Sequence, residues 1–433
     1  MWGCGFGMTT LAARPRSGFS PAQVAGLSAW YDPSDLGTLF QDVAMTLPVT
    51  APGQSVAAMA DKSGNGRHMV QEVADRRPVC GREPVTGRRN LLTRTEEFAD
   101  AVWHRLGNGG GITPTVASNA VVAPDGSLTA DMVTIDRSSV SGLSFLTQKK
   151  TDDGVQKARS YYIRASRPDD VGKTTDNWCW DGTVKFREAL VLTAEWSRVE
   201  LSPVSLLPGP GRELVALGYL DAGSLSPDTG EIRFDLWGMQ VEAGASATAY
   251  QRVVSDLDVT EAGVEARQFL YFDGVDDELV TPHQPIAGTS VFAGVAFAPA
   301  AGFPSSGEGA VFSDAGYQAG GLRLGWQGTQ QRIVSNSLAA ESLSPLTAFS
   351  VDAQRRNVQG LFTGPAPFAY FHGAGFVDMS PAYAPSLATP LTMGGAAAGF
   401  FAGRIYGGAY AAATRSEAEG LLRWVGQTCG LGI

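Results

Sequence analysis

The chain has 433 residues, enough for two or three domains. Charged residues make up 18% and hydrophobic residues 44%, while glycine (53) and proline (24) are frequent. This combination indicates many short strands joined by turns. The net charge of −10 argues against a nucleic-acid-binding surface, which is normally basic, and is compatible with a neutral or hydroxyl-rich ligand.

The cysteines are widely scattered, at Cys4, Cys80, Cys179 and Cys429. None forms a CxxC pair, so we expect buried free thiols and no metal knuckle. The chain contains no run of 18 apolar residues, which predicts that no segment inserts into a membrane. Its start lacks the basic residues and apolar core of a signal peptide.

Residues 1–18 are glycine-rich and apolar, with Trp2, Phe6 and Met8. Exposed side chains of this kind are a liability on a free monomer. We expect an N-terminal docking arm that binds another subunit, with simple disorder of the terminus as the alternative.

Residues 19–89 begin the first β-sandwich. Ser20 and Pro21 predict a short helical turn, because serine is a good N-cap and proline suits the first helical position. The apolar residues 27–31, which end in Trp30 and Tyr31, predict the opening strand.

The stretch 61–68 predicts a tight loop, since it combines glycines with short polar side chains. The alternating oxygens of Asp61, Ser63 and Asn65 are weak candidates for binding Ca²⁺. A turn without metal is the alternative, because the other ligands of an EF-hand loop are missing.

Residues 90–254 form a separable block. Apolar and polar residues alternate in 161–165, 192–199 and 234–244, which predicts half-buried strands. The Pro-Asp-Gly sequence at 124–126 is typical of a turn. This pattern favours a jelly roll.

Residues 255–433 resume the outer sandwich. Stretches 291–297 and 322–326 predict packed strands. Ser416 and Glu419 have the spacing of a capping box, and the apolar residues after them predict a helix with one buried stripe.

The stretch 271–279 predicts a strand followed by an Asp-Gly turn with an acidic rim. Asp273 and Asp276, together with Asp277, are weak Ca²⁺ candidates at this rim. A solvated acidic turn is the alternative. Apart from possible Ca²⁺, we expect no cofactor.

The motifs of common enzymes are missing. No Glu-x-Asp-x-Glu pattern, Gly-x-Ser-x-Gly elbow or His-Glu-x-x-His occurs. Gly172-Lys173-Thr174 has arginine at position 167, where a phosphate-binding loop requires glycine. We therefore predict a protein that is not an enzyme.

Aromatic residues supply the candidate ligand site. Trp178 and Trp180 would lie on the same face of a strand, with Asn177 and Asp181 close by. Flat side chains stack on the apolar faces of sugar rings, and polar neighbours bond the hydroxyls. Burial of both tryptophans in the core is the alternative.

Trp103 and His104 are a second candidate, with a core position for Trp103 as the alternative. Trp196 and Trp237 fit strand positions and are predicted to lie in the core.

Residues 90–254 resemble the carbohydrate-binding jelly-roll modules of tail fibres and spikes of bacterial viruses. Four elements carry the resemblance: Asn-Leu-Leu at 90–92, the pair Phe98 and Trp103, Pro-Asp-Gly-x-x-Thr-Ala-Asp at 124–131, and Trp-Gly-x-Gln-x-Glu-x-Gly at 237–244. The flanking parts, 19–89 and 255–433, resemble one concanavalin-A-like (laminin-G-like) sandwich. The expected fold is all-β: two β-sandwich or jelly-roll domains, the second inserted into the first, with few short helices.

These resemblances imply a receptor-binding spike or fibre of a tailed phage. The architecture is also similar to that of the head spikes of gene transfer agents. They imply a non-catalytic adhesin that binds capsular polysaccharide for host attachment. Such a protein would lie on the virion or particle surface after synthesis in the bacterial cytoplasm, as a homo-oligomer that contacts other virion proteins through its arm. A purely structural particle component and a polysaccharide depolymerase are the alternatives.

Overall fold

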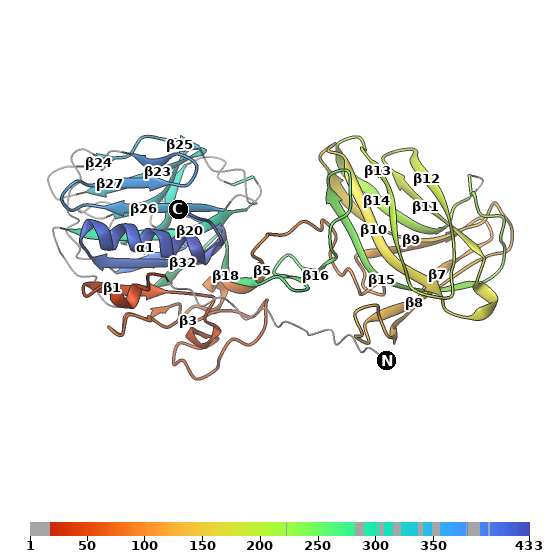
Figure 1. Ribbon diagram of the computed structural model, residues 1–433, viewed down its shortest axis with the longest axis horizontal. Coiled ribbons are helices and arrows are strands. Elements are labelled where there is room, and N and C mark those ends of the chain that lie inside the picture. Colours follow the sequence, from red (N-terminus) through yellow and green to blue (C-terminus); the bar gives the residue numbers. More distant parts are fainter. Residues whose placement is uncertain are drawn as a thin grey trace, which may run out of the picture.

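A computed structural model describes residues 18–221, 223–281, 290–300, 302–303, 307–314, 322–336, 341–348, 356–377, 379, 390–396 and 399–433. Within these residues the chain is all-β, with one α-helix and a few short 3₁₀ turns, which confirms the predicted fold class. Figure 1 shows two β-sandwiches side by side. The predicted arm lies outside the described residues except for Gly18.

The larger sandwich is built from strands at both ends of the chain. Its first sheet runs in the order β16 (Gln251–Ser255), β17 (Asp258–Glu261), β5 (Val79–Pro84), β18 (Ala266–Asp273), β32 (Ala402–Ala412), β20 (Val291–Pro299), β26 (Asn357–Phe362), β27 (Phe368–Phe371) and β28 (Gly375–Val377), and β1 (Leu27–Tyr31) also pairs with β32. Strands from before and after the smaller sandwich are therefore neighbours in one sheet.

The second sheet of the larger sandwich runs in the order β2 (Leu39–Phe40), β3 (Ala58–Met59), β4 (Met69–Val70), β19 (Leu279–Val280), β29 (Leu391–Met393), β21 (Glu308–Asp314), β22 (Leu322–Gln327), β23 (Gln330–Asn336) and β24 (Glu341–Leu343), and β25 (Thr347–Ala348) pairs with β23. A small hairpin of β30 (Gly395–Ala396) and β31 (Gly399–Phe400) lies beside it.

Strand β20 shows how sequence alternation builds two apolar layers. Val295 and Phe297 belong to the core between the two sheets. Phe292 and Ala296 point to the other side, where they pack with the helix α1 (Arg415–Thr428). Both faces of this strand are covered, so it is apolar throughout.

The N-cap of the helix lies two residues before the predicted one. Thr414 is the N-cap, and its side chain accepts a hydrogen bond from the backbone N–H of Glu417. The Glu417 side chain accepts the backbone N–H of Thr414 at 2.8 Å. The predicted box of Ser416 and Glu419 is therefore wrong, because Thr414 and Glu417 offer the same spacing where the chain leaves β32.

The smaller sandwich consists of two five-stranded sheets. The β11 sheet runs in the order β12 (Val184–Val191), β11 (Thr174–Trp180), β14 (Gly209–Tyr219), β9 (Leu143–Asp152) and β6 (Trp103–Asn108). The β15 sheet runs in the order β13 (Ser197–Val204), β10 (Lys157–Ala165), β15 (Ile232–Ala243), β8 (Ala130–Arg137) and β7 (Gly111–Val121). A separate apolar core lies between these two sheets.

The two crossings between the sandwiches lie side by side and are hydrogen-bonded to each other. The Asn90 side chain donates to the backbone carbonyls of Met239 and Gln251, each at 3.0 Å. Gln251 in turn accepts the backbone N–H of Arg89 at 2.6 Å. Strand β16, most of which falls within the predicted block 90–254, pairs with β17 in the larger sandwich.

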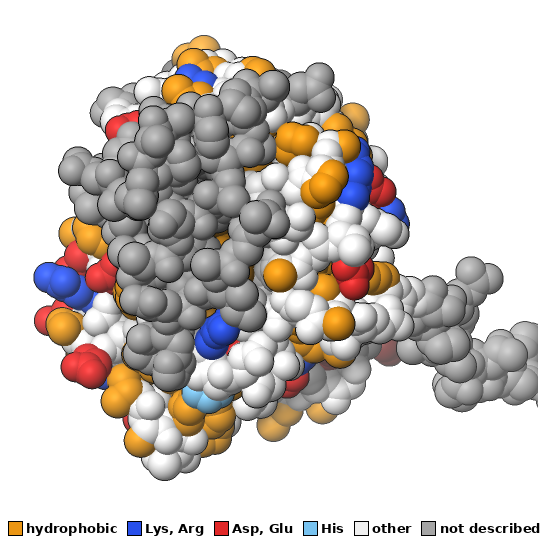
Figure 2. All heavy atoms as spheres, turned by 90° about the vertical axis from the view of Figure 1, so that its left-hand side faces the viewer, with side chains coloured by type: hydrophobic (Ala, Val, Ile, Leu, Met, Phe, Trp, Pro, Cys, Tyr) orange, Lys and Arg blue, Asp and Glu red, His pale blue; other side chains and the backbone are white. Residues whose placement is uncertain are grey.

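The surface is mixed in character. Figure 2 looks at the end of the larger sandwich, and in its coloured part hydrophobic side chains form small groups between polar and charged ones. No helix in the described part of the chain is long and apolar enough to cross a bilayer. Cys80, Cys179 and Cys429 are buried free thiols, as predicted, and Cys4 lies outside the described residues.

Candidate functional site

Strand β11 positions both tryptophans of the first candidate on the outer face of its sheet. Alternation turns Cys179 into the core between the two sheets and turns Trp178 and Trp180 the other way. Trp178 is only 2% exposed, whereas Trp180 is half-buried at the strand end. Trp180 therefore offers the more accessible ring.

Neighbouring strands complete an aromatic floor around these rings. Phe145 of β9 packs edge-on against Trp178, with 4.7 Å between ring centroids. Ala216 and Leu220 close the same small apolar cluster. The outer face of the sheet thus carries a cluster of its own, separate from the core on the inner face.

Beside the floor lies a hollow of about 280 Å³, lined by both tryptophans, Phe145, Leu143, Val184, Leu220, Lys149, Glu213 and Asp221. We call it the β11 hollow. Strand register explains the mixture, because Glu213 of β14 pairs with Trp180 on one side and with Lys149 of β9 on the other. A ring, a carboxylate and an ammonium therefore stand in one row across the sheet.

The charges in this row interact. Nζ of Lys149 lies 3.8 Å from Oε1 of Glu213. Burial raises the pKa of Glu213 above its ordinary value of 4.5, and the charge of Lys149 only partly offsets that effect. Both groups can hydrogen-bond to hydroxyl groups, the carboxylate as acceptor and the ammonium as donor.

The two polar candidates beside these tryptophans, Asn177 and Asp181, do not line the hollow. Asn177 is fully buried and faces inward, where its Oδ1 accepts a hydrogen bond from the Tyr161 hydroxyl. Asp181 is buried in the turn after the strand and accepts the backbone N–H of Leu207 at 3.0 Å. The structure uses both side chains to hold the sandwich together.

Trp103 and His104 separate in the same way. Trp103 is 1% exposed, packs on Phe98 at 5.0 Å between centroids, and donates its indole N–H to the carbonyl of Arg94 at 2.9 Å. His104 is exposed on β6 at the edge of the β11 sheet. Its partner in register is Thr147 of β9, the strand that also carries Phe145 of the aromatic floor.

The loop after β3 uses its oxygens to bind backbone groups. Oδ1 of Asp61 accepts the N–H groups of Trp30 and Ser63, both at 2.9 Å. Oδ2 accepts the Ser63 hydroxyl and the N–H of Arg67. The Asn65 side chain donates to the carbonyl of Leu27 at 2.8 Å. Because donors surround these oxygens, the loop does not fit a Ca²⁺ site and acts as a clamp on β1.

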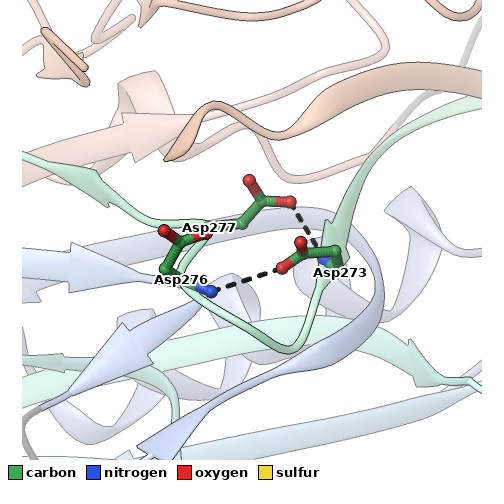
Figure 3. Close-up of side chains that lie close together, drawn as sticks. All are labelled: Asp273, Asp276 and Asp277. Carbon is green, nitrogen blue, oxygen red and sulfur yellow. Dashed lines mark hydrogen bonds between the residues drawn. The ribbon is translucent and has the colours of Figure 1, made fainter. Parts of the chain in front are cut away.

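The acidic rim after β18 brings three carboxylates together (Figure 3). Ligand oxygens of Asp273, Asp276 and Asp277 lie within 4.8 Å of one another. Asp277 accepts the N–H of Asp273 at 2.9 Å. Burial, and then the charges of its two neighbours, raise the pKa of Asp277 to about 6. Carboxylate oxygens are the ligands that Ca²⁺ prefers, and Ca²⁺ takes about six to eight oxygens in all. Ca²⁺ binding by these three residues stays a prediction.

Sequence reasoning missed Phe145, Lys149 and Glu213. Phe145 and Lys149 lie on β9 and Glu213 lies on β14, so they come close to the tryptophans of β11 only through strand pairing, and no local motif marks them. It also misplaced Trp196, which is half-buried on the outer face of the β15 sheet, with Arg164 4.9 Å above its ring. Trp237 is buried as expected, yet under the loops of that same outer face.

No family model matches the chain, and no curated protein matches it either. Among solved structures, the Clostridium thermocellum xylanase 10B CBM22-1–GH10 modules with xylohexaose align at 13% identity and a TM-score of 0.24 over 37% of this chain and 28% of that one. Mouse laminin alpha1 domains LG4-5 align at 10% identity and 0.26, covering 60% and 83%. The CBM22-1–CBM22-2 tandem of Paenibacillus barcinonensis Xyn10C aligns at 10% and 0.24, covering 75% and 98%. Likenesses at this level assign the chain to no family.

Proposed function

We propose that this protein is a non-catalytic adhesin of a phage or gene-transfer-agent particle that binds polysaccharide on the host cell surface. The observation that carries the proposal is the β11 hollow, where the half-buried ring of Trp180 stands beside the Lys149–Glu213 pair. Its location on the outer face of an open sheet leaves room for a chain-like ligand to pass across.

The chemistry of the hollow suits a sugar. A pyranose ring has an apolar face of C–H groups, which an indole ring can cover, and equatorial hydroxyls at its rim. Glu213 and Lys149 lie where such hydroxyls would need partners, and a hydrogen bond to a charged group contributes more than one between neutral groups. Aromatic floor and charged rim together are the usual composition of a small-ligand site.

The particle setting rests on the resemblance of residues 90–254 to phage carbohydrate-binding modules. The resemblance is supported by how its elements are used here, since Asn90 of the opening is bonded to Met239 in the closing strand. In this setting the N-terminal arm attaches the protein to other virion components, and several copies present the β11 hollow to the capsule.

The first test is binding of the whole protein to purified capsular polysaccharide of the host, measured by calorimetry. Trp180→Ala should weaken binding at least about tenfold, because loss of an anchoring aromatic costs about 2 kcal/mol. It should leave the fold intact, since Trp180 is half-buried. Trp178→Ala is a poorer probe, because removing a buried tryptophan destabilises the domain itself.

The matched control is Trp196→Ala, which removes a half-buried tryptophan just before β13, on the outer face of the opposite sheet, and should leave affinity unchanged. Equal binding by wild type and Trp180→Ala would remove the β11 hollow from the proposal. A folded wild type that binds no capsule would favour a structural particle component.

The non-catalytic part needs its own measurement. A glycoside hydrolase requires two carboxyl groups about 5–10 Å apart with separate roles. Of the two carboxyl groups that line the β11 hollow, those of Glu213 and Asp221, that of Glu213 is paired with a lysine. We expect no release of reducing ends from capsule after prolonged incubation. Release that disappears in Glu213→Gln would instead identify a depolymerase.

A further inference from the structure

A second hollow, of about 680 Å³, lies where the larger sandwich meets the crossings to the smaller one. We call it the junction hollow. Its lining includes the side chains of Leu257, Tyr271 and Pro299 together with Arg88, Asp256 and Arg404. Figure 1 places β5 and β16, on which this region is built, between the two sandwiches.

The cations around the junction hollow outnumber the anions. Arg88 is paired with Asp256, and Arg404 is paired with Glu83. Glu83 is fully buried and is also held by Arg356 at 2.7 Å, so its single charge is shared. The local excess is positive in a protein whose net charge is −10.

Lys150 of the smaller sandwich adds a further positive charge. Burial and the charge of Arg88 lower the pKa of Lys150, and Asp256 raises it. Lys150 is therefore within electrostatic reach of the Arg88–Asp256 pair. Both sandwiches contribute cations to the same region.

Asp256 is the exposed partner of Arg88 in this positive region. Its side chain is 76% exposed, while that of its partner Arg88 is 16% exposed. The Arg88 guanidinium is held in place by the backbone carbonyls of Asn90 and Leu92. Its carboxylate partner is exposed, so a second carboxylate of the right shape can take the place of that partner. Tyr271, half-buried in the same lining, offers a ring edge or face to the rest of a sugar.

We propose that the junction hollow is a second glycan subsite, which binds the carboxylate of an acidic sugar against Arg88 and Arg404 and the sugar ring against Tyr271. This deepens the proposed function, on which it rests, by specifying an acidic polysaccharide as the ligand class. The junction hollow and the β11 hollow share no lining residue, so a polysaccharide that occupied both would bind more tightly than at either one alone.

The test uses the full chain and titrates a short oligogalacturonate, with the uncharged oligogalactose of the same length as comparison. Wild type should bind only the charged probe, and binding should weaken as salt is raised. Arg88→Gln should weaken binding at least about tenfold, as expected for the loss of a charge-assisted contact.

Asp256→Asn is the decisive variant, because it should bind the charged probe about threefold or more tightly once the competing carboxylate is gone. Arg88→Gln also loses contacts to backbone carbonyls and could loosen the junction for that reason. Asp256→Asn changes an exposed side chain and does not carry this risk. Equal binding of both probes, absence of binding, or an Asp256→Asn variant no tighter than wild type overturns the proposal.

Trp180→Ala separates this proposal from the function as a whole. It should leave oligogalacturonate binding unchanged while it weakens binding to capsule. If Trp180→Ala has no effect on capsule binding and Arg88→Gln abolishes it, the β11 hollow fails and the junction subsite stands. If Trp180→Ala weakens capsule binding and Arg88→Gln does not, the junction subsite is wrong and the β11 hollow stands.

Discussion

The two outer faces of the smaller sandwich both carry aromatic clusters, and they use them differently. On the β15 sheet, Trp237 packs between Tyr162 and Tyr250, at 5.3 and 4.6 Å between centroids. Its indole N–H donates to the hydroxyl of Thr129 at 2.9 Å, and the Tyr250 hydroxyl bonds Thr95 and Glu96. The rings pack on one another, and the polar atoms of Trp237 and Tyr250 are engaged within the protein.

On the β11 sheet the rings instead border an open hollow with a charged pair at its rim. The comparison teaches that a group of tryptophans and tyrosines does not by itself indicate a binding site. The useful sign is whether loops cover the rings and satisfy their polar atoms, or leave a ring beside polar groups that face solvent.

The largest expected effect is on the covered face. Trp237→Ala should lower the free energy of unfolding by about 3–5 kcal/mol, because it leaves a cavity beneath the loops and removes the hydrogen bond to the Thr129 hydroxyl. Urea denaturation of the variant and of Trp180→Ala measures the contrast. A loss below about 1 kcal/mol for Trp237→Ala would show that the two faces are equivalent.

A smaller effect is expected from Tyr250→Phe, which removes only the hydroxyl group. Stability should fall by about 1–2 kcal/mol, since the Glu96 and Thr95 oxygens lose a partner in a buried setting. Capsule affinity should stay at the wild-type value, as measured by the same calorimetry. An affinity loss without destabilisation would transfer the binding site to the β15 sheet.

The smallest effect concerns Glu213 and its dependence on pH. Because burial raises its folded pKa above 4.5, the native state takes up this proton more readily than the unfolded chain. The resulting contribution to stability is full below the unfolded pKa and is lost as pH rises through the folded pKa.

Glu213→Gln cannot lose that contribution, so at pH 7 it should be more stable than wild type by less than about 1 kcal/mol. Thermal unfolding between pH 4 and 7 gives the measurement, with Glu97→Gln at a more exposed carboxyl as the control. A variant whose stability follows wild type at every pH would show that Glu213 is not desolvated.

Much of the fold is local information. The Pro-Asp-Gly turn has Gly126 at φ +89°, a conformation that favours glycine, and the alternation of β20 matches its two apolar layers. The β11 hollow could not be predicted in full, because Lys149 and Glu213 reach Trp180 only through strand register. The alternation of residues along a strand predicts that neighbouring side chains face opposite sides of the sheet. It does not predict which face the loops will cover, and Trp196 was misplaced for that reason.

The two hydrogen-bonded crossings at Asn90 and Gln251 have a consequence for how such chains diversify. Since the smaller sandwich leaves and re-enters its host at one point, and each sandwich has its own core, the smaller one is a cassette. A different domain whose ends lie close together can be inserted at this position without a change in the strand pairing of the larger sandwich. The proposed glycan specificity can then change by recombination in one step, while the larger sandwich keeps its structure.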